Sequence, residues 1–394
     1  MKNIKTQKGI TLIALVITII VMLILVGVTI SMAINGGLFG YAKKAAKDTE
    51  TQKQAEQELA SGAVIVDGVK YDSMQDYMDG IPAGAPKPID KVEKDENGIL
   101  KGNAIYTSDG KTSIIPKGFK MSNKKEEQSI ANGLVIQDET GNEYVWVPVE
   151  NEDGTLVRTE WSNNEPTGTI SSDYTETLPD DLVNSVKTYK GFYIGRYEAG
   201  CKDNPRTSRE DTLTDVLTKR GLYPYNYVNY DNAVNQTAKM YTDKTKYGVV
   251  ATLPYGAMWD ETLRFVKDDK HSVTDSTNWG NYPNATFTFN GKYCENSDAT
   301  SPTYTEGTNK DKPENKAWLL TTGASEINKA KNIYDLAGNV QEWTQESLST
   351  GSRVFRGGYY SYCDIPASNR SHHIDPSNTG TSNQLGFRPA LYIK

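Results

Sequence analysis

The residues of this sequence that best suit a metal ion lie in one short block, DLAGNVQEW, which runs from Asp335 to Trp343. The block offers the carboxylates of Asp335 and Glu342, side-chain amides and the carbonyls of a turn. Hard cations such as Ca²⁺ take about six to eight oxygen ligands, commonly carboxylate and backbone oxygens together. The same residues also suit a packed turn, with Trp343 in the core and Glu342 in a salt bridge. The residue types alone leave both interpretations open.

The sequence contains few cysteines and histidines for thiol or imidazole chemistry. The chain has three cysteines in 394 residues, so at least one of them has no disulfide partner within the chain. Its three histidines are His271, His372 and His373, and the adjacent pair would point to opposite faces of a strand. A site built from several histidine ligands is therefore not expected.

A segment near the C-terminus has the composition of a binding surface. Residues 359–385 contain three Tyr, five Ser, three Asn, two Asp, two His and two Thr. Tyr gives a large amphipathic contact area at low entropic cost, and Ser and Asn give adaptable hydrogen bonding, as in antibody paratopes. The alternative is an ordinary solvated, irregular surface.

A second tyrosine-rich stretch precedes it in the chain, with Tyr223, Tyr225, Tyr227 and Tyr230. Two-residue spacing would put three of these rings on one face of a strand. Rings on a wet surface are good anchors for sugars or proteins, although they also serve to cover a core. We favour the core interpretation for this stretch.

The composition of the whole chain excludes one class of partner. Lys and Arg number 43 against 50 Asp and Glu, so the formal net charge is −7, and 37% of the residues are hydrophobic. This balance excludes a positive electrostatic potential over the whole chain that would attract nucleic acid, and we expect no nucleic-acid partner.

The N-terminus carries a strong signal for a membrane. Residues 10–34 form an apolar run in which 20 of 25 residues are Ala, Val, Ile, Leu or Met, and no charged residue lies between Lys8 and Lys43. At about 1.5 Å per residue a helix of this length exceeds the roughly 30 Å hydrocarbon core of a bilayer. Three lysines precede the run, which predicts a cytoplasmic N-terminus and a chain that continues outside the cell. A secretory signal would have a shorter apolar region, whereas a plain membrane anchor stays open as an alternative.

The rest of the chain predicts a spacer followed by an irregular α+β domain. Residues 61–131 alternate short apolar pieces with turn-rich stretches, which is typical of a spacer or small subdomain. Residues 132–149 contain two β-rich runs around a turn, and residues 191–200 contain a further strand. A helix is expected to begin near Trp259, and strands are expected in RVFRGG and GFRPALYIK. We therefore place one α+β domain over residues 132–394.

The N-terminal segment resembles the type IV pilins and pseudopilins over residues 1–60. A basic leader, Gly9 and an uninterrupted apolar run beginning at Ile10 follow one another in the order that this family has. The resemblance implies a leader of residues 1–9, cleavage between Gly9 and Ile10 by a prepilin peptidase, and a transmembrane and stalk helix over 10–60. The family usually has Glu at the fifth mature position, where this chain has Ala14. That departure favours a minor or tip subunit among other pilin subunits, or an anchored protein that does not polymerise.

The C-terminal domain resembles the formylglycine-generating, or sulfatase-modifying factor, family. The blocks that carry the resemblance are, in order, GNEYVWVPVE, GFYIGRYEAG, WDETLRFV, NIYDLAGNVQEW, RVFRGG and GFRPALYI. The resemblance implies a C-type-lectin-like fold. It also implies a structural Ca²⁺ whose ligands would be Asp335, Gly338, Val340 and Glu342, with the glycine and the valine binding through their carbonyls.

The same resemblance bears on catalysis. Enzymes of the family hold copper(I) between two cysteines shortly after the RGG block, because paired soft thiolates select Cu(I). After Arg356-Gly357-Gly358 this chain has only Cys363, one residue later than the family's first cysteine, and no cysteine follows it. No copper is therefore expected, no catalytic residue is assigned, and an enzyme is not our prediction.

A third resemblance concerns the tyrosine-rich segment before GFRPA. The C-type-lectin-fold variable proteins of diversity-generating retroelements carry a variable region between similar fixed flanks, enriched in the same residue types. The resemblance implies that ligand contacts and sequence variation fall on Tyr359, Tyr360, Tyr362, Asn369, His372, His373, Asn378 and Asn383.

Together these features predict a surface-displayed, pilin-like protein that binds an external protein or glycan through its C-terminal lectin-like domain. It would lie at the cell membrane with that domain outside, as an adhesin or as a minor or tip pilin. Two alternatives from other classes stay open: an extracytoplasmic copper oxidase of the formylglycine-generating kind, and a purely structural minor pseudopilin.

Overall fold

The computed structural model describes residues 18–22, 47, 49, 62–298, 302–372 and 382–394. The chain divides into two compact units, Met1–Ala85 and Pro86–Lys394. The predicted cleavage site at Gly9 and Ile10, and most of the predicted span over 10–34, lie outside the described residues. Residues 18–22 are helical, and within the described residues no helix has the length and apolar character that a bilayer crossing needs.

From residue 62 onward the first unit is a hairpin followed by one short helix. Strands β1 (Val64–Val66) and β2 (Val69–Tyr71) pair antiparallel. Asp67 and Gly68 both have positive φ, 52° and 79°, as a two-residue turn of this kind requires. Helix α3 (Met74–Met78) begins after Ser73, whose hydroxyl accepts a hydrogen bond from the Asp76 amide at 3.0 Å.

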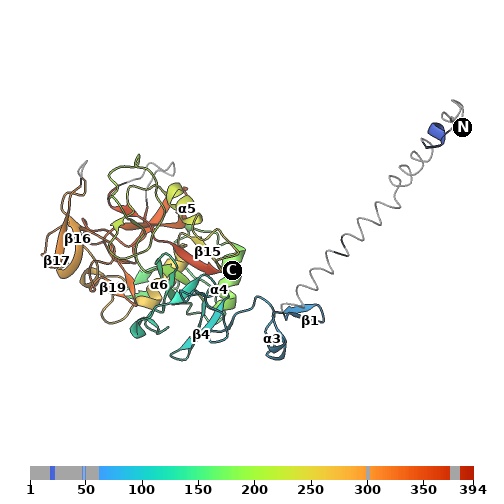
Figure 1. Cartoon of the computed structure of the whole chain (residues 1–394). Helices are drawn as coiled ribbons and strands as arrows, with labels where there is room; N and C mark the ends of the chain where they lie inside the picture. The colour runs from blue at the N-terminus through green and yellow to red at the C-terminus, as the bar shows by residue number, and fades with distance from the viewer. Residues whose placement is uncertain (1–17, 23–46, 48, 50–61, 299–301, 373–381) are drawn as a thin grey trace, which may run out of the picture. The chain divides into compact units, whose positions relative to one another are not determined.

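A six-stranded sheet forms the centre of the second unit, in the order β15-β25-β12-β8-β7-β6 (Figure 1). All of its neighbouring strands pair antiparallel. The strands are β6 (Phe119–Met121), β7 (Val135–Asp138), β8 (Glu143–Pro148), β12 (Gly191–Gly195), β15 (Val249–Thr252) and β25 (Ala390–Ile393). The predicted hairpin within 132–149 is confirmed as β7 and β8, and the predicted strands within 191–200 and at the C-terminus are β12 and β25.

Both faces of the central strands are buried, which explains their nearly continuous apolar sequence. In β8, Val145 and Val147 belong to one hydrophobic core, whereas Tyr144 and Trp146 belong to another. This alternation follows from the two-residue period of a strand. A sheet buried on both faces needs a layer on each side, and both layers come from this unit.

Residues 86–131 supply one of these layers rather than a spacer. Strands β3 (Lys87–Pro88), β4 (Ala104–Ser108) and β5 (Lys111–Ile115) form a small sheet. Ile114 and Ile115 pack in the same core as Trp146, and β6 pairs with β7 across the predicted boundary. The boundary predicted at Asn132 therefore falls inside a compact unit. The prediction was wrong because the apolar residues that pack against the sheet are scattered through a turn-rich sequence.

Helices α4 and α6 cover the other face. Helix α6 (Gly256–Val266) buries Met258, Trp259 and Leu263 in the core that also contains Val145. Helix α4 (Asp180–Tyr189) contributes Leu182 and Val186 to that core, and it ends at Lys190, whose φ is 59°. The helix predicted to begin near Trp259 is confirmed as α6, which starts three residues earlier. A third helix, α5 (Tyr230–Ala238), is capped by Asn229.

A second sheet carries the C-terminal motifs. Strand β21 (Gln341–Leu348) pairs with β22 (Arg353–Arg356), which pairs with β23 (Ser371–His372). Strands β11 (Tyr174–Thr175) and β24 (Leu385–Gly386) pair with β21. The predicted RVFRGG strand is thus confirmed as β22.

Smaller sheets complete the unit. One has three strands, β16 (Phe287–Cys294), β17 (Tyr304–Lys312) and β18 (Leu319–Leu320). The others are the pairs β9 (Trp161–Ser162) with β10 (Glu165–Pro166), β13 (Gly200–Cys201) with β14 (Tyr223–Pro224), and β19 (Lys329–Ala330) with β20 (Ile333–Tyr334). Many short strands and few helices confirm the predicted mixed α and β, mostly sheet architecture.

Candidate functional site

The block from Asp335 to Trp343 is a packed turn leading into β21. Trp343 lies in a hydrophobic core, and Glu342 is fully buried in a salt bridge with Arg388 of the GFRPA block. Arg388 donates from Nε to both carboxylate oxygens of Glu342, at 3.1 and 3.0 Å, and from its second amino group at 2.6 Å. The packed-turn interpretation is therefore what the structure adopts.

Two further carboxylates share this buried site. Glu198 accepts hydrogen bonds from the Asn339 side chain at 2.7 Å and from the Val340 amide at 3.1 Å. Asp335 accepts one from the Gly323 amide at 2.6 Å. Burial raises the pKa of Asp335 to about 6, and burial together with Asp335 and Glu342 raises that of Glu198 well above its usual value. We call Glu198, Asp335, Glu342 and Arg388 the Arg388 cluster.

The Arg388 cluster does not fit the predicted calcium ligands. Both oxygens of Glu342 accept from a guanidinium, and a cation bound there would lie beside that positive charge. Within the described residues, no group of three or more His, Cys, Asp or Glu side chains is arranged to hold a metal ion. Calcium binding by Asp335, Gly338, Val340 and Glu342 stays a prediction, and it would require Arg388 to release Glu342.

The predicted binding residues divide between surface and core. Tyr359 is half-buried and its ring stacks on that of Tyr362 at 5.9 Å, while the Tyr362 side chain is 53% exposed. Tyr360, between them, is buried, and its hydroxyl lies 2.5 Å from Ser297 Oγ. Asn383, also buried, donates to the Tyr360 hydroxyl at 2.8 Å. Tyr360 and Asn383 thus hold the segment, and Tyr359 and Tyr362 face solvent.

The remaining predicted binding residues are less constrained. Asn369 is exposed, and its side chain accepts from the Ser371 hydroxyl at 2.9 Å. His372 pairs with Val354 through the backbone of β23. His373 and Asn378 lie outside the described residues.

The loop over residues 357–369 begins with a turn that only glycine can make. Gly358 has a φ of 72°, and a Cβ there would lie 2.0 Å from the carbonyl oxygen of Ile365. The backbone at Gly358 therefore passes directly beside the backbone at Ile365. Tyr360 adds a second tie, because its amide donates to the carbonyl of Asn339 at 3.0 Å.

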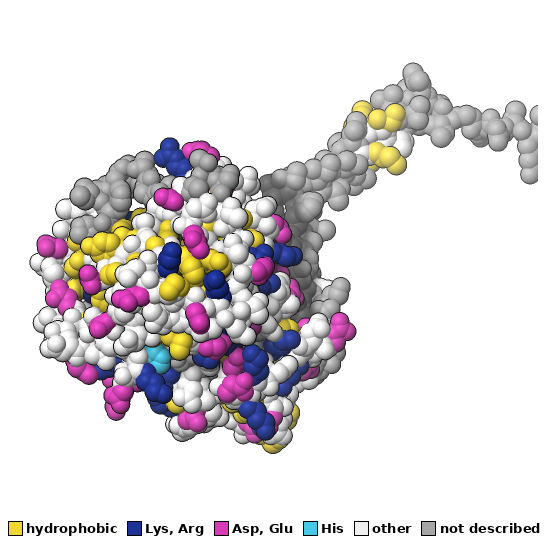
Figure 2. Space-filling model, turned by 90° about the vertical axis from the view of Figure 1, so that its left-hand side faces the viewer, with side chains coloured by type: hydrophobic (Ala, Val, Ile, Leu, Met, Phe, Trp, Pro, Cys, Tyr) yellow, Lys and Arg dark blue, Asp and Glu magenta, His cyan; other side chains and the backbone are white. Residues whose placement is uncertain are grey.

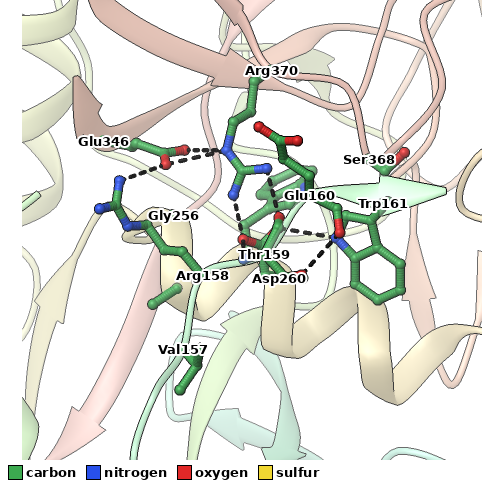
Figure 3. Close-up of polar contacts among 12 residues, drawn as sticks. Val157, Arg158, Thr159, Glu160, Trp161, Gly256, Asp260, Glu346, Ser368 and Arg370 are labelled. Carbon is green, nitrogen blue, oxygen red and sulfur yellow. Dashed lines mark hydrogen bonds and ion pairs between the residues drawn. The ribbon is translucent and has the colours of Figure 1, made fainter. Parts of the chain in front are cut away.

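An arginine at each end of the 357–369 loop enters the same buried pair of carboxylates, Asp260 and Glu346. Figure 3 shows Arg370 in contact with both of them. Arg356 at the end of β22 donates to Asp260 of α6 at 2.9 Å. Arg370 at the other end donates to Asp260 and, at 3.0 and 3.1 Å, to both oxygens of Glu346 in β21. Arg356 also donates to the carbonyls of Asn369 and Ser368, at 2.9 and 3.1 Å.

Two more charged residues complete this group, which we call the basal ion network. Arg158 donates to Glu346 at 3.0 Å and lies 3.5 Å from Glu176. Glu176 accepts from the first two amides of α6, Gly256 at 2.7 Å and Ala257 at 3.1 Å. Burial, and next the charge of Glu346, raise the pKa of Glu176 to about 7. The network consists of Arg158, Glu176, Asp260, Glu346, Arg356 and Arg370.

Asp260, Glu346 and Arg370 are not among the site residues predicted from the sequence. Asp260 follows Trp259 inside an apolar helix pattern, and a charge in such a position is a signal for a buried ion pair. Its partner could not be read from the sequence, because Arg356 is 96 residues away.

The three cysteines are free thiols, and only Cys363 in the 357–369 loop is partly accessible. Burial raises the pKa of Cys201 to about 12 and also raises that of Cys294. Both of these thiols are therefore poor sources of thiolate at neutral pH.

The second tyrosine-rich stretch mainly covers the core. Tyr225 and Tyr230 are buried in the hydrophobic core around Trp343. Tyr223 is half-buried, stacks edge-on against Tyr304 of β17 and lies under the Lys292 ammonium, 5.4 Å from it. Figure 2 views the molecule from the side of β16 and β17, where apolar side chains gather among charged side chains of both signs.

Comparison with known proteins gives no curated protein that matches this sequence. Among solved structures the chain is similar to Treponema denticola variable protein 1, with 15% identity and a TM-score of 0.35, over 69% of this chain and 98% of that one. It is also similar to the crystal structure of CarF, with 14% identity and a TM-score of 0.29, over 52% of this chain and 87% of that one.

The family comparison covers more than half of the chain. The family model described as the sulfatase-modifying factor enzyme 1-like domain matches residues 166–393. This range includes the Arg388 cluster, the 357–369 loop and, except for Arg158, the basal ion network. The chain therefore belongs to the FGE-sulfatase family, the family of the sulfatase-modifying factor enzyme 1-like domain.

Proposed function

We propose that this protein binds an external protein or glycan through the 357–369 loop, and that it does so from the cell surface. The observation that carries the proposal is the stacked pair of Tyr359 and Tyr362. The pair offers a flat, amphipathic contact area on a loop that is tied down at both ends. A pre-ordered loop loses little conformational entropy on binding, so more of its contact energy appears as affinity.

The tyrosines of the loop differ in burial, and this difference supports the proposal. The polar groups of Tyr360 and Asn383 form hydrogen bonds inside the protein, with each other and with Ser297. Tyr362 is 53% exposed, a large exposure for an aromatic side chain. Binding energy is expected to come from this ring pair, because tyrosines in such positions are common hot spots.

Binding rather than oxidation is proposed because of the cysteines. The copper(I) chemistry of the family needs two thiolates, and Cys363 is the only cysteine after the RGG block. Cys201 and Cys294 are buried thiols with raised pKa values, which does not favour them as its partner.

The cell-surface location rests on the N-terminal sequence. We propose that residues 10–34 anchor the protein in the membrane, that a prepilin peptidase cuts after Gly9, and that the second unit lies outside the cell. Association with other pilin subunits belongs to the same proposal. Replacement of Gly9 by Val should leave the nine-residue leader uncut, which N-terminal sequencing of the membrane fraction detects.

We further propose that a retroelement diversifies the 359–385 segment. A near-identical template repeat beside the gene, differing only at adenines, would support this part. A complete gene neighbourhood without a template or a reverse transcriptase would overturn it and leave the binding proposal standing.

The experiment uses the full-length protein on an array of glycans and purified extracellular-matrix proteins. Tyr359→Ala with Tyr362→Ala should abolish the binding that the wild type gives, while the melting temperature stays nearly unchanged because the rings are outside the core. A matched control is Tyr71→Ala with Tyr77→Ala, since these two rings also contact each other, edge-on with centroids 5.2 Å apart, in the first unit.

Two outcomes would contradict the proposal. The first is equal binding by the Tyr359/Tyr362 variant and the wild type, which would exclude this loop as the contact surface. The second is copper-dependent oxygen consumption with a cysteine-containing peptide, lost on Cys363→Ser, which would place the protein among the oxidases.

A further inference from the structure

The hairpin of β1 and β2 in the first unit has two edges, and each presents backbone groups to its surroundings. Its two-residue turn makes Val66 and Val69 the closing pair, and the register then sets Ile65 opposite Lys70. In a hairpin of this kind the closing pair exchanges backbone hydrogen bonds, so the N–H and C=O of the next pair point outward. Ile65 therefore presents these groups at the β1 edge, and Lys70 presents them at the β2 edge.

The two edges differ in how they are covered. At the β2 edge the carbonyl of Lys70 accepts a hydrogen bond from the Ala83 amide at 2.7 Å, so the chain that follows α3 lies against this strand. At the β1 edge, no hydrogen bond to the outward N–H or C=O of Ile65 is found in the part of the chain that the structure describes. The β1 edge is thus the one that can accept a further strand.

The β1 edge also lacks the features that normally keep strand edges apart. Strand β1 reads Val64-Ile65-Val66, without a charge or a proline, and its pairing with β2 has no bulge. Natural proteins usually place a lysine, a proline or a bulge on an exposed edge, because unpaired N–H and C=O groups otherwise pair with a strand of another chain. Strand β2 carries such a lysine, Lys70, whereas β1 does not.

Large apolar side chains are exposed around the same hairpin. Among residues 62–298, 302–372 and 382–394, eight large hydrophobic side chains are exposed, and five of these lie between Ile65 and Met78. Ile65 itself is 60% exposed. An isolated two-stranded hairpin is marginally stable in water, and a further strand or an apolar contact stabilises it. Association at β1 would therefore satisfy backbone groups and remove apolar surface from water together.

The sequence of β1 suits pairing with a second copy of itself. A valine flanks Ile65 on each side, so an antiparallel pair centred on Ile65 sets Ile65 opposite Ile65 and Val64 opposite Val66 of the second copy. A twofold axis produces this arrangement, with the same surface on both chains. The pair forms two backbone hydrogen bonds through the Ile65 residues and places no charge opposite another charge.

We propose that β1 is a self-association edge, at which two copies of this chain join by antiparallel pairing of Val64–Val66. The two hairpins then form one four-stranded sheet. The inference does not rest on the proposed ligand, since no residue of the 357–369 loop takes part in it.

The first test traps the pair by cross-linking the purified full-length protein in detergent. Cys363→Ser is the background, because Cys363 is the partly accessible thiol among the three free cysteines. Ile65→Cys should give a disulfide-linked dimer on mild oxidation, since opposed residues have Cα atoms about 5.5 Å apart, within the roughly 4.4–6.8 Å that a disulfide spans. Lys70→Cys, on the covered edge, is the matched control. Its dimer should form at least about tenfold more slowly, because only a paired strand holds two thiols at a high effective concentration.

The second test weakens the pair by adding a charge to the edge. Ile65→Lys places two like charges directly opposite each other, so the dimer dissociation constant should rise at least about fivefold. Analytical ultracentrifugation of the full-length protein in the same detergent measures this constant. Ile327→Lys is the control and should leave the constant unchanged, because Ile327 is a similarly exposed isoleucine, 49% exposed, in the second unit.

Three results would overturn the proposal. One is a wild type that is monomeric at every concentration, and another is cross-linking of Ile65→Cys and Lys70→Cys at equal rates. The third is a dimer whose dissociation constant does not change in Ile65→Lys, which would assign the association to another part of the chain, such as residues 10–34. Because the side chains of Ile65 and Lys70 are exposed, the melting temperatures of these variants should equal that of the wild type.

Discussion

The Arg388 cluster and the basal ion network are both buried groups of charges, but carboxylates are in excess in the first and equal in number to the arginines in the second. The Arg388 cluster has three carboxylates around one arginine, and the pKa values of all three carboxylates are raised. The basal ion network has three arginines and three carboxylates, and burial together with Arg370 lowers the pKa of Arg356. The first group therefore accommodates protons readily, whereas in the second each arginine has a carboxylate partner and Glu176 is the carboxylate with a raised pKa.

The comparison also explains why the sequence motifs occur together. The arginine of GFRPA holds the glutamate of LAGNVQEW, and the arginine of RVFRGG holds the aspartate of WDETLRFV. Each pair joins blocks that lie far apart in the chain. The first pair fixes the turn that supports Tyr360, and the second closes the base of the 357–369 loop.

The largest effect is expected for Arg388→Met. It leaves Glu342 buried beside two other carboxylates without a positive partner, and loss of one partner from a buried pair costs about 3–5 kcal/mol. Urea unfolding at pH 7 measures this loss. The double variant Arg388→Met with Glu342→Gln should recover part of the stability, and a loss below about 1 kcal/mol in the single variant would show that the pair is not buried as described.

A smaller loss, about 3 kcal/mol, is expected for Asp260→Asn. This change removes the carboxylate shared by Arg356 and Arg370, so limited proteolysis should also cut the 357–369 loop faster. Asp269→Asn is the matched control, because that residue is exposed near the end of the same helix and should change stability by less than about 0.5 kcal/mol. Equal protease resistance of the Asp260 variant and the wild type would exclude a clamp at the base of the loop.

The pH dependence of the free energy of unfolding should reveal the contribution of Glu176 to the basal ion network. Its pKa is raised to about 7 in the folded protein, from an ordinary value of 4.5. The protonated carboxyl therefore favours folding below pH 4.5, and this contribution is lost as the pH rises through 7. Between pH 5 and 8 the wild type should lose up to about 3 kcal/mol more stability than Glu176→Gln. Parallel pH profiles of the two proteins would contradict the assignment.

The smallest effect is expected from calcium. Because Arg388 occupies both oxygens of Glu342, excess Ca²⁺ should leave the melting temperature of the wild type unchanged. A ligand that binds only the folded state raises this temperature. A rise that disappears in Glu342→Gln would instead support the calcium site predicted from the sequence.

Much of the fold was accessible from local patterns. The runs around Tyr144 and Phe192 are nearly all apolar, and both became central strands buried on two faces. Residues 86–131 were misjudged, because their apolar residues are few and their packing against Trp146 depends on a distant strand. Of the residues predicted to contact a ligand, Tyr362 is exposed and Tyr359 is half-buried, whereas Tyr360 and Asn383 are buried.

The sequence by itself determined the order of the motif blocks, the apolar N-terminal run, the alternation within strands and the single cysteine after RGG. These are properties of neighbouring residues or of composition, and no folding is needed to read them. The tertiary structure alone decided which charge each buried arginine meets and which tyrosine faces water. Those outcomes depend on contacts between residues 46 or 96 positions apart, which the path of the backbone sets and local periodicity does not encode.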